Sequence, residues 1–171
     1  MKTKLYGITH FILLFIAFFF QSSPVIKRFE VGETVPNIVF VLLFVYALFL
    51  KDTEVVSYSV IFGTLTDLIF GKIYGITTLL LILFVCIYIF LNRYIFTESM
   101  WVVILYCFLS SILYESLLLI INTAIWNEAV ISGEVFKILV TRCVYNGIVC
   151  IPVFYFARKI HRQKQEVRID G

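Results

Sequence analysis

Long apolar blocks constrain the fold of this chain more than any other feature of its sequence. A helix needs roughly 20 predominantly apolar residues to cross about 30 Å of hydrocarbon, and about 17 suffice where the bilayer thins. A transmembrane barrel would instead need short segments of alternating polarity. The blocks predict an all-α integral membrane protein, a compact bundle of six transmembrane helices at about residues 5–20, 35–50, 55–70, 73–91, 100–121 and 135–157.

Overall composition agrees with a chain that lies almost wholly in a membrane. Hydrophobic residues make up 61% of the 171 residues and charged residues 15%, whereas soluble domains average about 45–50% and about 25%. Residues 1–157 are therefore predicted to form one transmembrane domain, and residues 158–171 a basic cytoplasmic tail. The net charge of +3 does not indicate nucleic-acid binding, because the basic residues gather beside a membrane segment, where topology explains them.

The distribution of lysine and arginine predicts the orientation of the bundle. With a cytoplasmic N-terminus, the inner side holds Lys2, Lys4, Lys51, Arg93, Arg158, Lys159, Arg162, Lys164 and Arg168, and the outer side holds only Lys27, Arg28 and Lys72. Basic residues are enriched in cytoplasmic loops, so both termini of this multi-pass protein are expected in the cytoplasm. The two larger loops, 21–34 and 122–134, then face outward.

The first apolar block has a second interpretation, since its basic start, its apolar core and the residues QSSP resemble a secretory signal peptide. Cleavage of such a peptide normally follows an A-x-A-like site, which this segment lacks. We therefore expect the block to be retained as a transmembrane helix.

Patterns typical of metal sites and of soluble enzymes are missing from the sequence. The four cysteines lie inside apolar blocks without CxxC spacing, and His10 and His161 lie near opposite ends of the chain. The sequence contains neither a Gly-rich phosphate loop nor a nucleophile elbow. We expect no metal, no cofactor and no enzymatic activity.

Charged residues inside the apolar blocks are the best candidates for a functional site. Asp67, Glu115 and Arg142 each interrupt such a block, and a charge at mid-bilayer costs about 2.5–3.5 kcal/mol on insertion scales unless it faces the protein interior. Counting about 1.5 Å per helical residue puts all three in the outer half of the membrane. Asn37 falls at a compatible depth, and Asn146 lies one turn from Arg142. These five residues are predicted to form one polar cluster.

The cluster has three interpretations. A guanidinium group has five N–H donors, so Arg142 is expected to balance Asp67, Glu115 or both, in an ion pair that specifies the helix arrangement. The second interpretation is a site for a ligand or a partner. The third is a catalytic carboxylate pair of the kind that intramembrane aspartyl proteases use, but their glycine–aspartate signature is absent. The structural ion pair is the favoured interpretation.

Small residues recur every four positions around Asp67, and this spacing places them on one face of a helix. Without a hydrophobic driving force in lipid, small residues let two helix backbones approach closely. We therefore assign Ser59 and Gly63 to helix packing. Gly71 and Gly75 are assigned to a tight outer turn around Lys72, because glycine tolerates positive φ angles.

Two motifs give the sequence a family resemblance. A Pro-Asn pair, Pro36 and Asn37, opens the second block, and a Gly-x3-Asp-Leu-x2-Gly-x3-Gly stretch spans the third and fourth. The second motif consists of Gly63, Asp67, Leu68, Gly71 and Gly75. In their order and spacing within a six-helix chain, these residues resemble the rod shape-determining MreD family of bacterial inner-membrane proteins. The resemblance is sharp over residues 34–81 and depends on length and topology elsewhere.

The resemblance implies a non-enzymatic scaffold of the cell-elongation complex, needed for rod shape and directed lateral peptidoglycan synthesis. Its implied partners are a bitopic MreC-like protein, MreB filaments and peptidoglycan synthases. It also implies a fold like that of the substrate-binding subunits of energy-coupling-factor transporters. We add the hypothesis that the polar cluster holds the outer half of the bundle in the shape that a partner's transmembrane helix recognises.

The fold analogy also supplies an alternative function. A substrate-binding subunit of a vitamin-type transporter would use the same outer cluster to hold a small molecule beneath loops 21–34 and 122–134. No row of tryptophans and polar groups suited to a vitamin ring is present in the sequence, and the motif resemblance favours the scaffold.

Overall fold

The computed structural model describes residues 2–71, 74–93, 99–126 and 133–169. All regular elements within these residues are helices. Lys72, the centre of the predicted turn, and much of the outer loop 122–134 lie outside the described residues. The elements are α1 (Lys2–Ser22), the 3-10 helix η1 (Pro24–Phe29), α2 (Ile38–Phe49), α3 (Asp52–Phe70), α4 (Ile76–Asn92), α5 (Met100–Trp126) and α6 (Gly133–Ile169).

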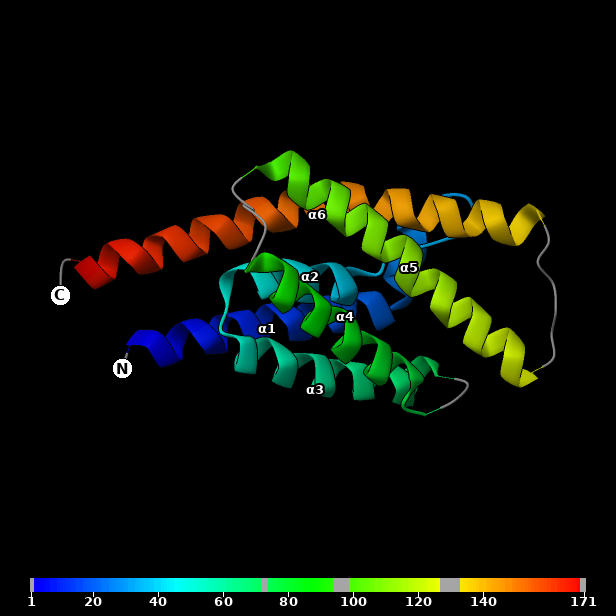
Figure 1. Ribbon diagram of the computed structural model, residues 1–171, viewed down its shortest axis with the longest axis horizontal. Coiled ribbons are helices and arrows are strands. Elements are labelled where there is room, and N and C mark those ends of the chain that lie inside the picture. Colours follow the sequence, from blue (N-terminus) through cyan, green and yellow to red (C-terminus); the bar gives the residue numbers. More distant parts are fainter. Residues whose placement is uncertain (1, 72–73, 94–98, 127–132, 170–171) are drawn as a thin grey trace.

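The six α-helices follow the six predicted blocks in order, and they run back and forth along the long axis of the molecule (Figure 1). The start of α1 and the end of α6 lie at the same end of that axis (Figure 1). By length and composition, α3, α5 and α6 contain stretches that can cross a membrane, whereas the apolar stretches of α1, α2 and α4 are shorter. The described residues thus indicate an all-helical membrane protein, and three of their helices meet the length criterion for a span.

Helix α2 is shorter than the predicted block 35–50, because it begins only at Ile38. Pro36 restricts the backbone before it, and the Asn37 side chain accepts a hydrogen bond from the Phe40 amide at 3.1 Å, as an N-cap does. The 12 residues of α2 extend about 18 Å. All nine residues from 39 to 47 are buried, and α1, α3, α4 and α6 surround the helix. Its continuous hydrophobicity therefore reflects contact with other helices more than with lipid.

Helix α6 is longer than predicted, since it continues from the apolar block through the basic segment to Ile169. The boundary predicted at residue 157 is therefore wrong as the end of the helix. The residues that follow are mostly lysine, arginine, glutamine and glutamate, which have high helix propensity. Neither glycine nor proline occurs between 158 and 169 to interrupt the helix.

Two antiparallel helix pairs position the candidate site. α3 packs along α4, α5 packs along α6, and α2 lies between the pairs in contact with α4 and α6. The start of α2, the end of α3 and the start of α4 lie at the end of the molecule opposite the start of α1 (Figure 1). The polar residues of the predicted cluster lie at this end.

Candidate functional site

Asp67 lies in the last turn of α3, is 3% exposed and binds the first turn of α4. Its carboxylate accepts hydrogen bonds from three backbone amides, those of Gly75 at 3.1 Å, Thr77 at 3.0 Å and Thr78 at 2.9 Å. The Thr78 hydroxyl donates a fourth at 2.6 Å. Helix α4 has no side-chain cap from its own N-cap residue, Gly75. Asp67 therefore supplies that cap from the neighbouring helix.

This arrangement explains how a carboxylate is tolerated inside an apolar helix. The first N–H groups of a helix have no partner within it, and the helix dipole gives that end a partial positive charge. A carboxylate there makes charge-assisted hydrogen bonds, roughly twice as strong as neutral ones. None of these four hydrogen bonds comes from Arg142. The option that Arg142 balances Asp67 is thus not the arrangement seen, because the start of α4 supplies the donors instead.

Glycines allow α3 and α4 to meet at this junction. A Cβ added to Gly63 would lie 2.7 Å from the Cα of Thr78, so only glycine lets the two backbones approach this closely. Gly75 has a φ of 96°, as the turn prediction required. Gly71 does not have the positive φ angle that the turn prediction required, since its φ is −71°. Its added Cβ would instead lie 2.5 Å from the carbonyl oxygen of Asp67.

Replacing Gly63 by alanine is expected to destabilise the chain by about 1–3 kcal/mol, the usual cost of overpacking a well-packed site. The added methyl group meets the backbone of Thr78, which cannot rotate away. The measurement is the midpoint of SDS-induced unfolding in mixed micelles. Gly147→Ala is the matched control, because a Cβ there meets nothing within 4 Å, and we expect it to be neutral or stabilising by about 0.4–1 kcal/mol. Equal midpoints for Gly63→Ala and the parent would contradict the close approach of the two helices.

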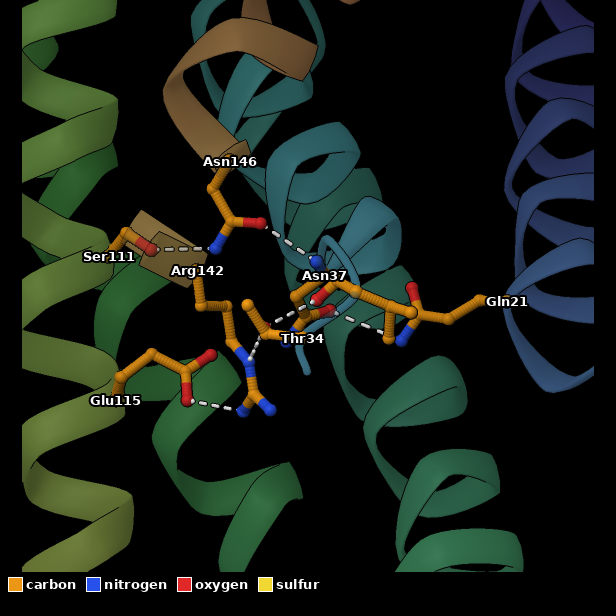
Figure 2. A network of polar contacts seen from close by, with 8 residues as sticks. Gln21, Thr34, Asn37, Ser111, Glu115, Arg142 and Asn146 are labelled. Atoms are coloured by element: carbon orange, nitrogen blue, oxygen red, sulfur yellow. Dashed lines mark hydrogen bonds and ion pairs between the residues drawn. The ribbon is translucent and has the colours of Figure 1, made fainter. Parts of the chain in front are cut away.

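Arg142 of α6 pairs with Glu115 of α5 (Figure 2). Its Nη1 lies 3.0 Å from Glu115 Oε2, and its Nε donates to the Thr34 hydroxyl at 3.0 Å. The Glu115 side chain is 7% exposed and that of Arg142 33%. Of the pairings left open by the sequence, the structure thus contains the one with Glu115. The guanidinium group also ties the segment before α2 to α6.

Asn146 extends this network one turn along α6 (Figure 2). It is fully buried, its Oδ1 accepts from the Asn37 amide at 2.8 Å, and its Nδ2 donates to the Ser111 hydroxyl at 2.7 Å. From α1, Gln21 Oε1 accepts from the Val39 amide at 3.0 Å. The N–H groups at the start of α2 have no partner within that helix, and side chains of α1 and α6 accept their hydrogen bonds. Asp67 does the same for the N–H groups at the start of α4.

The predicted cluster consequently divides into two parts. Asn37, Glu115, Arg142 and Asn146 belong to one network, whereas Asp67 belongs to the α3–α4 junction. Sequence reasoning did not identify the partners Gln21, Thr34, Thr77, Thr78 and Ser111. Only Ser111 had a sequence signal, since it lies four residues before Glu115 on the same helix face. The others lie in a connecting segment or at helix ends, where periodicity gives no information.

An open cavity of about 600 Å³ lies between the two parts of the cluster. Helices α1, α3, α4, α5 and α6 contribute to its lining, together with the segment before α2. Its polar lining residues, besides the Glu115–Arg142 pair, are Gln21, Asn37, Thr66, Thr77 and Asn122. Its apolar wall includes Pro36, Phe70, Tyr114 and Leu118. The site thus combines a hydrogen-bond network with a cavity of mixed polarity.

A sequence model of one protein family covers nearly the whole chain. The family is described as rod shape-determining protein MreD, and the match spans residues 1–160. The chain belongs to the MreD family. Among curated proteins and among solved structures, no match was found. Membership gives this chain a role in rod-shape determination, and it confirms the resemblance inferred from the motifs.

The motif residues of this chain do not all share one location. Gly63, Asp67, Gly71 and Gly75 meet at the α3–α4 junction, and Pro36 and Asn37 lie where α2 begins. Leu68 is 62% exposed and faces away from the site. Ser59, assigned to packing, is fully buried, and its hydroxyl donates to the Val56 carbonyl at 2.8 Å.

Proposed function

We propose that this MreD-family chain is a non-enzymatic membrane scaffold of the bacterial cell-elongation complex. In this function it binds a bitopic MreC-like protein and connects it with MreB filaments and peptidoglycan synthases, so that lateral wall synthesis is directed. The observation that carries the proposal is the family match over residues 1–160. The site supplies a physical reason why such a protein can act by binding alone.

Both buried carboxylates are committed to structural partners. A general acid or base must reach the proton that it transfers within about 2.6–3.2 Å, directly or through one water. All four hydrogen bonds to Asp67 come from the start of α4, and Glu115 is bound to Arg142. Such an arrangement favours a rigid binding surface over a catalytic centre.

We further propose that all six helices cross the cytoplasmic membrane and that both termini are cytoplasmic. The alternating helix directions in Figure 1 support this proposal, and so does the excess of lysine and arginine on the side of the termini. The shorter helix α2 fits because it is enclosed by other helices, and irregular backbone at membrane depth is tolerated when protein buries it. The polar network then lies near the outer leaflet, where it holds the helix ends in the shape that a partner's transmembrane helix recognises.

Co-purification tests this function directly. The chain is fused at its C-terminus to a fluorescent protein that matures only in the cytoplasm. It is co-expressed with an MreC-like bitopic protein, and the membranes are then extracted in a mild detergent. We expect fluorescence in intact cells and recovery of the bitopic protein in near-stoichiometric amount. A bitopic protein of unrelated sequence and equal length is the control. Recovery no greater than that of the control would contradict the scaffold, and absent fluorescence would contradict the orientation.

The transporter subunit is the second candidate, and the cavity of about 600 Å³ favours it. The same cells distinguish the two functions. Saturable uptake of a vitamin that depends on this chain, together with failure to recover the bitopic protein, would select the transporter subunit.

A further inference from the structure

The described lining of the cavity at the polar end of the bundle has a balanced charge. The only charged residues in its described lining are Glu115 and Arg142, and these two form the ion pair at 3.0 Å. The lining therefore has no net charge for a charged ligand to neutralise. An ion that entered would lose hydration without gaining a counter-charge, which is costly in such an environment.

The same ion pair still has hydrogen-bonding capacity that faces the cavity. Among the described residues, none hydrogen-bonds to the Nη2 of Arg142 or to the Oε1 of Glu115. Figure 2 shows the second terminal guanidinium nitrogen directed away from Glu115. Asn122, which also lines the cavity, adds an amide that can both donate and accept. The cavity thus offers donors and acceptors side by side.

Apolar and aromatic side chains lie among these polar groups in the lining. Tyr114, Phe70 and Leu118 contribute carbon atoms, and Leu118 lies between Glu115 and Asn122 on one face of α5, so a ligand would meet polar and apolar groups side by side. The volume of about 600 Å³ falls within the roughly 300–1,000 Å³ of small-molecule sites. Because five α-helices and the segment before α2 line this space, it suits a small molecule better than the helix of a partner protein.

We propose that this cavity binds an uncharged small molecule that combines hydroxyl or amide groups with apolar surface. N-acetylated sugars have this chemistry, since they combine hydroxyl groups, one amide, a methyl group and a ring face of C–H bonds. Arg142 Nη2 and the Asn122 amide serve as donors to the ligand, and Glu115 Oε1 serves as an acceptor. The proposal depends on the cavity alone, whether the chain acts as a scaffold or as a transporter subunit.

Saturation-transfer NMR on the full chain in lipid nanodiscs tests the proposal, with N-acetylglucosamine as the probe. For a ligand of this size we expect a Kd on the order of 1 mM, and saturation transfer to the acetyl methyl group. Leu118→Trp fills the cavity and should make the signal about tenfold weaker. Ile120→Trp is the matched control, because Ile120 lies on the same helix, is 59% exposed and does not line the cavity. It should leave the signal unchanged.

A second variant protects the test if Leu118→Trp does not fold. Asn122→Leu removes one amide from the lining without adding bulk, and it should weaken the signal several-fold. No saturation transfer in the parent, or equal signals in the parent and both cavity variants, would overturn the proposal. Displacement of the sugar by inorganic phosphate at equal concentration would overturn the preference for an uncharged ligand. A signal abolished by co-expressed bitopic protein would assign the cavity to that partner instead.

Discussion

An Arg142→Leu variant is expected to lose about 3 kcal/mol of folding free energy. Removal of one partner from a buried ion pair leaves the other charge uncompensated, which typically costs about 3–5 kcal/mol. We place the effect at the lower end because the Arg142 side chain is 33% exposed, although that of Glu115 is only 7% exposed. The variant also loses the bond from Arg142 Nε to Thr34, so the segment before α2 should loosen. SDS titration of the purified chain measures the loss.

The controls separate the ion pair from the simple loss of a charge. Arg93 pairs with Asp52 at 3.0 Å, but both side chains are more than half exposed, so Arg93→Leu should cost at most about 1 kcal/mol. The double variant Arg142→Leu/Glu115→Leu removes the stranded carboxylate and should recover most of the lost stability. A double variant as unstable as Arg142→Leu alone would show that the ion pair is not the cause.

Much of the helix arrangement could be predicted from the sequence, because burial in lipid requires long apolar stretches. The six blocks at their approximate positions correspond to α1 to α6. Glu115, Arg142 and Thr66, the neighbour of Asp67, line one cavity, and the depth of the three charged residues in the membrane stays a prediction. The MreD resemblance drawn from residues 34–81 is confirmed over residues 1–160.

Hydropathy could not predict how α2 is used. Residues 38–49 are as apolar as a lipid-facing helix, yet nine of them are buried among other helices. Apolar side chains satisfy a lipid environment and a protein interior equally well, so an apolar block does not reveal which of them surrounds it. The helix was predicted to start at residue 35 for a related reason. The apolar block continues through Val35 and Pro36, but Pro36 restricts the backbone before it and Asn37 is the N-cap, so the helix begins only at Ile38.

The partner of each buried charge was also beyond sequence reasoning. Opposite charges at similar depth suggested an ion pair with either carboxylate, but the donors to Asp67 are mostly backbone amides. Those donors come within reach of Asp67 because Gly63 lets the start of α4 approach α3 closely. Periodicity shows that Gly63 and Asp67 share a helix face, but not what faces them.

Asp67→Ala is expected to have the second large effect, a loss of about 3 kcal/mol or more. Hydrogen bonds to a charged group contribute about 1.5–3 kcal/mol each, non-additively, and four donors depend on this carboxylate. The first N–H groups of a helix have no partner within it, so loss of the carboxylate leaves these amides without their acceptor. Asp67→Asn keeps one acceptor oxygen and should therefore lose less than Asp67→Ala.

Hydrogen exchange locates this effect within the chain. If Asp67 caps α4, the amides of Gly75, Thr77 and Thr78 should exchange faster in Asp67→Ala under conditions where the rest of the bundle stays folded. Asp52→Ala is the matched control, because Asp52 is an exposed carboxylate in the first turn of the same helix, and it should leave exchange at these amides unchanged. Uniformly faster exchange across all helices would mean that Asp67 stabilises the bundle as a whole. Unchanged exchange at the three amides would contradict the cap itself, and with it the account of why an apolar helix carries this carboxylate.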